Sequence, residues 1–75
     1  MNINGEEKTQ TADILVHGED GYEIEAIRTK EELTKQGYRC EYSVFNNEGS
    51  ARFYAQKKGI KKICVVNIKT RTEEV

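Results

Sequence analysis

The chain has 75 residues, of which 36% are hydrophobic and 33% are charged. A chain of this length forms one domain with a small core and a marginal free energy of folding. Twelve Lys and Arg against thirteen Asp and Glu give a formal net charge of −1, which argues against a general nucleic-acid binder, because such proteins carry a basic excess.

Residues 1–11 are polar and show no periodicity, so we interpret them as a flexible tail or linker before a single domain over residues 12–75. The tail has no apolar core of the kind found in a signal peptide. No apolar run approaches the roughly 20 residues of a membrane span. Cys40 and Cys64 lack metal-ligand spacing, and we interpret them as small buried side chains in a reducing compartment. These features predict a cytoplasmic protein with no membrane contact, metal or cofactor.

The first predicted strand covers residues 12–17 and is apolar on both alternating faces, as buried parallel strands are. A turn over residues 18–21 follows, with Asp20 as the predicted cap of a helix over residues 22–36. Gly37 is predicted to end this helix, because glycine readily adopts the left-handed conformation of a helix terminus.

The second predicted strand covers residues 38–45 and alternates between two kinds of side chain. One set is predicted to face the core: Tyr38, Cys40 and Tyr42. The other set is predicted to face solvent: Arg39, Glu41 and Ser43. One dry face and one wet face indicate a strand at the edge of a sheet. Asn47 or Ser50 is the predicted cap of the next helix.

The pattern of residues 51–66 predicts the second half of an amphipathic helix that ends at Gly59, followed by a buried strand over residues 63–66. Residues 67–75 are polar apart from Ile68. Two interpretations of this last segment stay open: a further hairpin strand, or a truncated end.

The element order is therefore β-α-β-α-β, an α/β fold with a mainly parallel three-stranded sheet and two helices. Right-handed crossovers and the two dry faces of the first strand predict the strand order 2-1-3. The third strand then needs a neighbour on its outer edge, either an added strand or a second copy that self-associates there. Cys40 and Cys64 fall on strands about 9.5 Å apart, beyond the reach of a disulfide.

Four lysines surround Gly59 and are the candidate contact residues: Lys57, Lys58, Lys61 and Lys62. They are either a solvated helix end or a docking patch for an acidic partner surface or an RNA backbone.

His17 ends the first strand, where open α/β sheets place their chemistry. Glu19 and Asp20 in the following loop would repel phosphate, so we interpret His17 as a structural residue. A small phosphocarrier-like domain that uses His17 is the lesser alternative. The chain has no Ser-His-Asp pattern and no Cys-x-x-Cys motif, and we predict neither catalytic nor cofactor-binding residues.

The two helix-to-strand passages resemble the anticodon-binding domain of class II synthetases, in the form found in histidyl-tRNA synthetase-like proteins. The first helix matches the family pattern at Ala26, Ile27, Leu33 and Gly37. The second helix and its strand match at Ala51, Tyr54, Ala55, Gly59, Ile60, Ile63 and Val66.

Residues 54–63, Tyr-Ala-Gln-Lys-Lys-Gly-Ile-Lys-Lys-Ile, are more similar to the C-terminal domain of the ATP phosphoribosyltransferase regulatory subunit of histidine biosynthesis. That family is a synthetase paralogue without aminoacylation activity. The resemblance implies a non-catalytic domain that supports assembly or regulation of the catalytic subunit of ATP phosphoribosyltransferase. The alternative is a tRNA-binding anticodon domain of histidyl-tRNA synthetase.

Overall fold

The computed structural model describes residues 11–75, so residues 1–10 of the predicted tail lie outside the described residues. Six elements follow one another along the chain: β1 (Ile14–Gly18), α2 (Glu23–Lys35), β2 (Cys40–Tyr42), α3 (Glu48–Lys58), β3 (Lys62–Val66) and β4 (Arg71–Glu74). The strands form one sheet of order β2-β1-β3-β4, in which the first three are parallel and β4 is antiparallel to β3. The predicted α/β class and the order 2-1-3 are confirmed.

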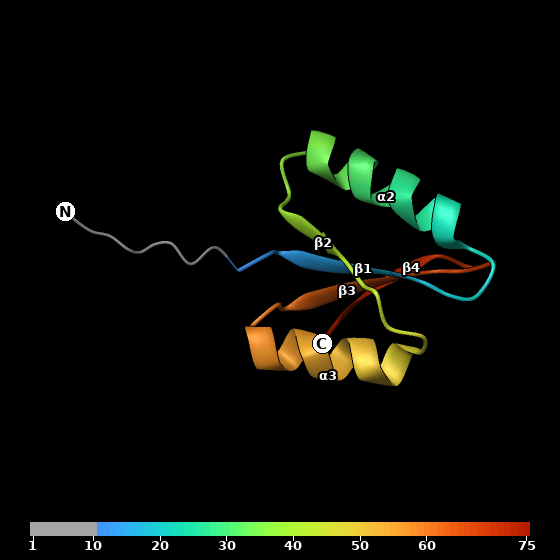
Figure 1. The fold of residues 1–75 in the computed structure, drawn as a ribbon. Helices are drawn as coiled ribbons and strands as arrows, with labels where there is room; N and C mark the ends of the chain where they lie inside the picture. Colours follow the sequence, from blue (N-terminus) through green and yellow to red (C-terminus); the bar gives the residue numbers. More distant parts are fainter. Residues whose placement is uncertain (1–10) are drawn as a thin grey trace.

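The sheet lies between the two helices, with α2 on one face and α3 on the other (Figure 1). The core on the α2 face consists of Ile14, Val16, Ala26, Cys64 and Val66. The core on the α3 face consists of Leu15, Ala51, Ala55, Ile60, Ile63 and Val65. Successive side chains of a strand point to opposite faces, so β1 and β3 supply both cores. This explains why both strands are apolar on both faces.

The turn before α2 does not use the predicted cap. The N-cap residue is Tyr22, whose side chain makes no capping hydrogen bond, and the assignment of Asp20 as cap was wrong. The backbone closes this turn instead: the N–H of Tyr22 donates to the carbonyl of Glu19 at 2.8 Å. The carboxylate of Glu23 accepts from the N–H of Gly21 at 3.3 Å.

The start of α3 has the predicted side-chain cap, and both helices end at the predicted glycines. Asn47 is the N-cap, and its side-chain oxygen accepts from the N–H of Ser50 at 2.8 Å. Gly37 has a φ of 103° and Gly59 a φ of 78°, both left-handed. The predicted glycine stops are confirmed.

Strand β2 is shorter than the predicted span of residues 38–45. The N–H of Tyr38 donates to the carbonyl of Leu33 at 3.1 Å, so this residue closes the turn that follows α2 and is not part of the strand. Its side chain is exposed rather than inward-facing. After β2, the N–H of Phe45 donates to the hydroxyl of Ser43 at 3.3 Å, which turns the chain away from the sheet.

The second face of β2 is only partly solvent-facing, which corrects the predicted alternation. Cys40 and Tyr42 pack against the core beneath α2, as predicted. Ser43 is buried, and the carboxylate of Glu41 accepts a hydrogen bond from the hydroxyl of Tyr54 on α3. The reason is that α3 returns over this face and covers side chains that a lone edge strand would expose.

Strand β4 occupies the outer edge of β3, with register from Lys62 opposite Glu74 to Val65 opposite Arg71. Of the two interpretations of residues 67–75, the hairpin strand is confirmed. The outer edge of β3, for which we expected either an added strand or a second copy, is therefore paired with an added strand of the same chain.

An ion-pair network ties β4 to α3. Glu48 at the start of α3 contacts Arg52 Nε at 2.7 Å and Arg71 Nη2 at 2.8 Å. Arg52 and Arg71 also both pair with Glu73 of β4. Within residues 11–75, neither helix combines the length and hydropathy needed to span a bilayer.

Candidate functional site

The four lysines of the predicted contact patch divide into two pairs. Lys57 and Lys58 lie in the last turn of α3. The ammonium nitrogen of Lys57 is 5.8 Å from the centroid of the Phe53 ring, and that of Lys58 is 5.9 Å from the centroid of the Tyr54 ring. A cation over an aromatic ring is attracted by the negative ring face. This pair is therefore associated with the aromatic side chains of α3.

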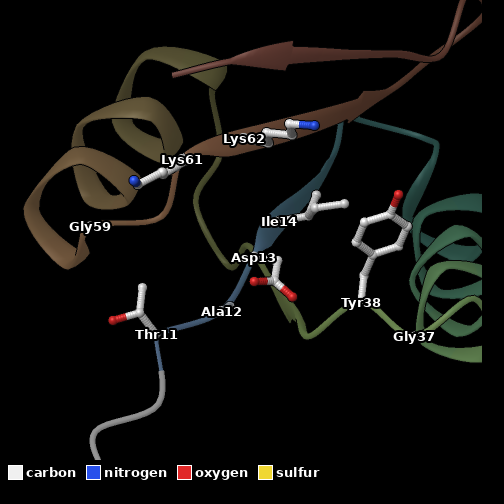
Figure 2. A pocket seen from close by; sticks show the side chains of 9 residues that line it. All are labelled: Thr11, Ala12, Asp13, Ile14, Gly37, Tyr38, Gly59, Lys61 and Lys62. Atoms are coloured by element: carbon white, nitrogen blue, oxygen red, sulfur yellow. The ribbon is translucent and has the colours of Figure 1, made fainter.

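Lys61 and Lys62 line an open pocket of about 610 Å³ at the amino-terminal edge of the parallel strands. Figure 2 shows Lys61 beside the end of α3, whereas Lys62 lies on β3 and faces Ile14 and Tyr38. The pocket also contains Asp13, whose carboxylate accepts from the backbone N–H of Arg39 at 2.9 Å. Its charge is mixed, and it lies opposite the edge at which open α/β sheets bind ligands.

A second surface, here called the aromatic groove, lies along the outer side of α3. It has a volume of about 580 Å³ and is lined by Phe45, Asn47, Gly49, Ser50, Phe53, Tyr54 and Lys57. The rings of Phe45 and Tyr54 are 5.2 Å apart between centroids, with an interplanar angle of 48°. The side chain of Phe53 is 64% exposed. The groove is thus an apolar surface with a cation on its rim.

The rings of the groove differ in how deeply they are buried. Ala51 and Ala55 of α3 are fully buried in the core beneath the helix. Phe45 and Tyr54 are partly buried and pack against this core, whereas Phe53 is exposed. The sequence did not predict the groove, since Phe45 joins it from the loop before α3.

Tyr54 forms a fixed wall of the aromatic groove. Its hydroxyl donates to the carboxylate of Glu41 on β2, and its ring packs against Phe45. The hydrogen bond to Glu41, together with burial, raises the pKa of Tyr54 above its ordinary value. The phenol therefore remains a neutral donor at physiological pH.

His17 lies at the carboxyl end of β1 and is 1% exposed. Its Nδ1 is 3.1 Å from the hydroxyl oxygen of Ser43, and its Nε2 has no hydrogen-bond partner among residues 11–75. Burial lowers the pKa of His17, and the nearby charges of Glu19 and Glu48 offset this only in part. The ring is enclosed, so it presents no exposed nitrogen of the kind that the phosphocarrier alternative needs.

Across residues 11–75, no three His, Cys, Asp or Glu side chains gather where they could hold a metal ion. A scan of the chain against protein-family models found no match, and comparisons with curated proteins and with solved structures also found none. Function is therefore inferred from the fold and from the surfaces described above.

Proposed function

We propose that this chain is a non-catalytic binding domain of a cytoplasmic protein. Its role would be to support assembly or regulation of a catalytic subunit, as the C-terminal domain of the ATP phosphoribosyltransferase regulatory subunit does. One observation supports the proposal: the residues that carry the resemblance are buried, partly buried or at a helix end, with the exception of Ile27, which is 48% exposed. Ala26 is buried on α2, and Ala51 and Ala55 are buried on α3. Gly59 ends α3 in a left-handed conformation, and Ile60 is buried directly after it.

The surface chemistry of the described residues also supports binding over catalysis. His17 and Ser43 are the side chains that most resemble a catalytic base and nucleophile, and both are buried. The aromatic groove is an open, largely apolar surface, which presents rings and a lysine instead of paired acids and bases. Exposed apolar surface with a polar rim is typical of a contact site for another molecule.

The test is co-expression of this chain with the short catalytic subunit of ATP phosphoribosyltransferase from the same genome. We expect the two chains to co-elute in size-exclusion chromatography, and the catalytic activity to depend on the presence of this chain. Separate elution together with unchanged activity would contradict the proposal.

A second candidate function is tRNA binding, as in the anticodon-binding domain of histidyl-tRNA synthetase. The observation in its favour is that all four lysines of the predicted contact patch are exposed, which leaves their charges available to an RNA backbone. Filter binding of histidine tRNA at low and moderate salt tests it. Tight binding that weakens steeply with salt would favour this candidate over the first.

A further inference from the structure

We infer that the aromatic groove is the docking site for an acidic peptide segment of a partner protein, which inserts one bulky apolar side chain between the rings. The inference rests on the proposed function in taking this chain as a binding domain. It adds the surface through which the domain binds and the chemistry of the segment that it recognises.

The apolar part of the inference follows from the groove's walls. Phe45 and Tyr54 form one packed wall, and Phe53 projects from α3 with 64% of its surface exposed. The polar residues Asn47 and Ser50 lie at one end of the groove, and Lys57 lies among the lining residues. Protein interfaces concentrate their binding energy where an aromatic or aliphatic anchor enters such an apolar pocket with a polar rim.

The acidic part of the inference follows from the charge around the groove. Lys57 lines it, and the first turn of α3 contributes the positive end of the helix dipole. The acidic groups nearby already have partners: Glu41 accepts from Tyr54, and Glu48 pairs with two arginines. The rim is therefore positive, and carboxylates that flank an apolar anchor complement it.

The state of the rings favours a peptide over single-stranded RNA. Base stacking needs an open aromatic face. Here the ammonium of Lys57 lies over Phe53, and that of Lys58 lies over Tyr54. Tyr54 also packs against Phe45. An apolar side chain can pack against the edges of these rings, which does not require a free ring face, and the net charge of −1 gives no general attraction to phosphates.

The experiment is a titration of the isotope-labelled chain with a synthetic peptide of sequence Glu-Asp-Glu-Phe-Glu-Asp-Glu, followed by amide chemical shifts in NMR. We expect the largest shifts at Phe45, Ser50, Phe53 and Lys57. The same peptide with alanine in place of phenylalanine is expected to bind about tenfold more weakly, which corresponds to about 1.4 kcal/mol. Absence of shifts at the groove overturns the inference.

Variants of the chain test separately the apolar contact with the peptide's phenylalanine and the charge contact with its carboxylates. Phe53→Ala and Lys57→Glu are each expected to weaken the peptide about tenfold. The matched controls are Ile27→Ala and Lys35→Glu on α2, which lies across the sheet from the groove; both side chains are exposed, and we expect unchanged affinity. Unchanged affinity in the two groove variants, or tighter binding of oligouridine than of the peptide at the same salt, overturns the inference.

The co-elution test distinguishes this inference from the proposed function. Co-elution with the catalytic subunit that survives Phe53→Ala overturns the groove as the contact surface and leaves the proposed function standing. Peptide binding at the groove without co-elution supports the groove and removes that catalytic subunit as the partner.

Discussion

Gly18 and His17 at the end of β1 carry the tightest constraints on single residues. A Cβ atom on Gly18 would lie 2.6 Å from the Cβ of Ala26 and 2.9 Å from the carbonyl oxygen of Tyr22. Real Cβ atoms do not approach other atoms this closely, so α2 rests directly on the backbone of β1. His17, the next residue toward the amino terminus, is enclosed on the opposite side beneath α3, where its ring meets Ser43.

Gly18→Ala is expected to lower the free energy of unfolding by about 1–3 kcal/mol, because α2 must move away from β1 to admit the methyl group. Urea denaturation followed by circular dichroism measures the loss. The control is Gly49→Ala, where the nearest atom to the added Cβ is the Asn47 side-chain oxygen at 3.3 Å. Alanine has the higher helix propensity and stabilises α3, whereas the close contact with Asn47 destabilises it. We therefore expect the free energy of unfolding to change by no more than about 0.5 kcal/mol. Equal losses would contradict the close approach of α2.

The burial of His17 predicts a pH dependence of stability. Its pKa is lowered in the folded state, so the unfolded chain takes up a proton first as the pH falls. Stability is then complete above the unfolded pKa of about 6.5 and falls as the pH decreases below it. The slope for one proton is at most about 1.4 kcal/mol per pH unit. Urea denaturation between pH 7 and pH 5 measures it.

The chain contains one histidine, so the slope in this pH window belongs mainly to His17. Glu48 and Glu73 contribute at lower pH, because hydrogen bonds from arginines lower their pKa values below the ordinary carboxyl value. His17→Gln is the control, and its stability is expected to be nearly flat from pH 7 to pH 5. An NMR titration in which His17 has a pKa of 6.5 or higher would contradict the prediction.

The two helices are held at their starts by different means, and this difference belongs to the scale of the elements. α3 begins at a side-chain cap, since Asn47 accepts from the N–H of Ser50 at 2.8 Å. α2 begins after a turn closed by the backbone, where the N–H of Tyr22 donates to the carbonyl of Glu19. An acidic residue in a loop before a helix therefore does not identify a cap without its geometry.

Asn47→Ala is expected to lower the free energy of unfolding by about 1 kcal/mol, because the first turn of α3 loses a hydrogen-bond acceptor. Asp20→Ala is the matched control and is expected to change stability by no more than about 0.5 kcal/mol, since Asp20 caps nothing. Thermal and urea denaturation measure both. A loss for Asp20→Ala as large as that for Asn47→Ala would restore the original sequence-based assignment.

At the scale of the whole molecule, β4 protects a sheet edge that the three-layer packing of helix, sheet and helix would otherwise leave open. β3 is buried on both faces, with Ile63 and Val65 beneath α3 and Cys64 and Val66 beneath α2. An unpaired strand of this kind is a template for pairing with other chains. β4 and its arginine contacts to α3 therefore complete the sheet within one chain.

Deletion of residues 67–75 is expected to convert the chain to a self-associating or unfolded form, because the edge of β3 then lacks its partner. Light scattering coupled to size-exclusion chromatography compares its mass with that of the full chain. Ile68→Ser is the control, since this side chain is 87% exposed in the turn before β4 and the strand stays in place. A truncated chain with the mass and circular dichroism of the full chain would contradict the role of β4.

The candidate site was less predictable than the fold. Lys57, Lys58, Lys61 and Lys62 are close in sequence, yet the first two lie against rings of α3 and the last two line a different pocket. Charge along a chain does not specify which way each side chain points after the chain turns at Gly59. The aromatic groove has no signal in the sequence, because Phe45 and Phe53 come from different segments.

The residue pattern alone predicts the first five elements, the helix stops at Gly37 and Gly59, and the order of the three parallel strands, since these follow from local conformational preference and from which strands are apolar on both faces. Tertiary structure decides what meets across the fold: His17 with Ser43, Glu41 with Tyr54, and β4 with the edge of β3. The physical reason is range. Backbone preference acts over a few residues, whereas burial, pKa and surface shape depend on segments that only folding brings together.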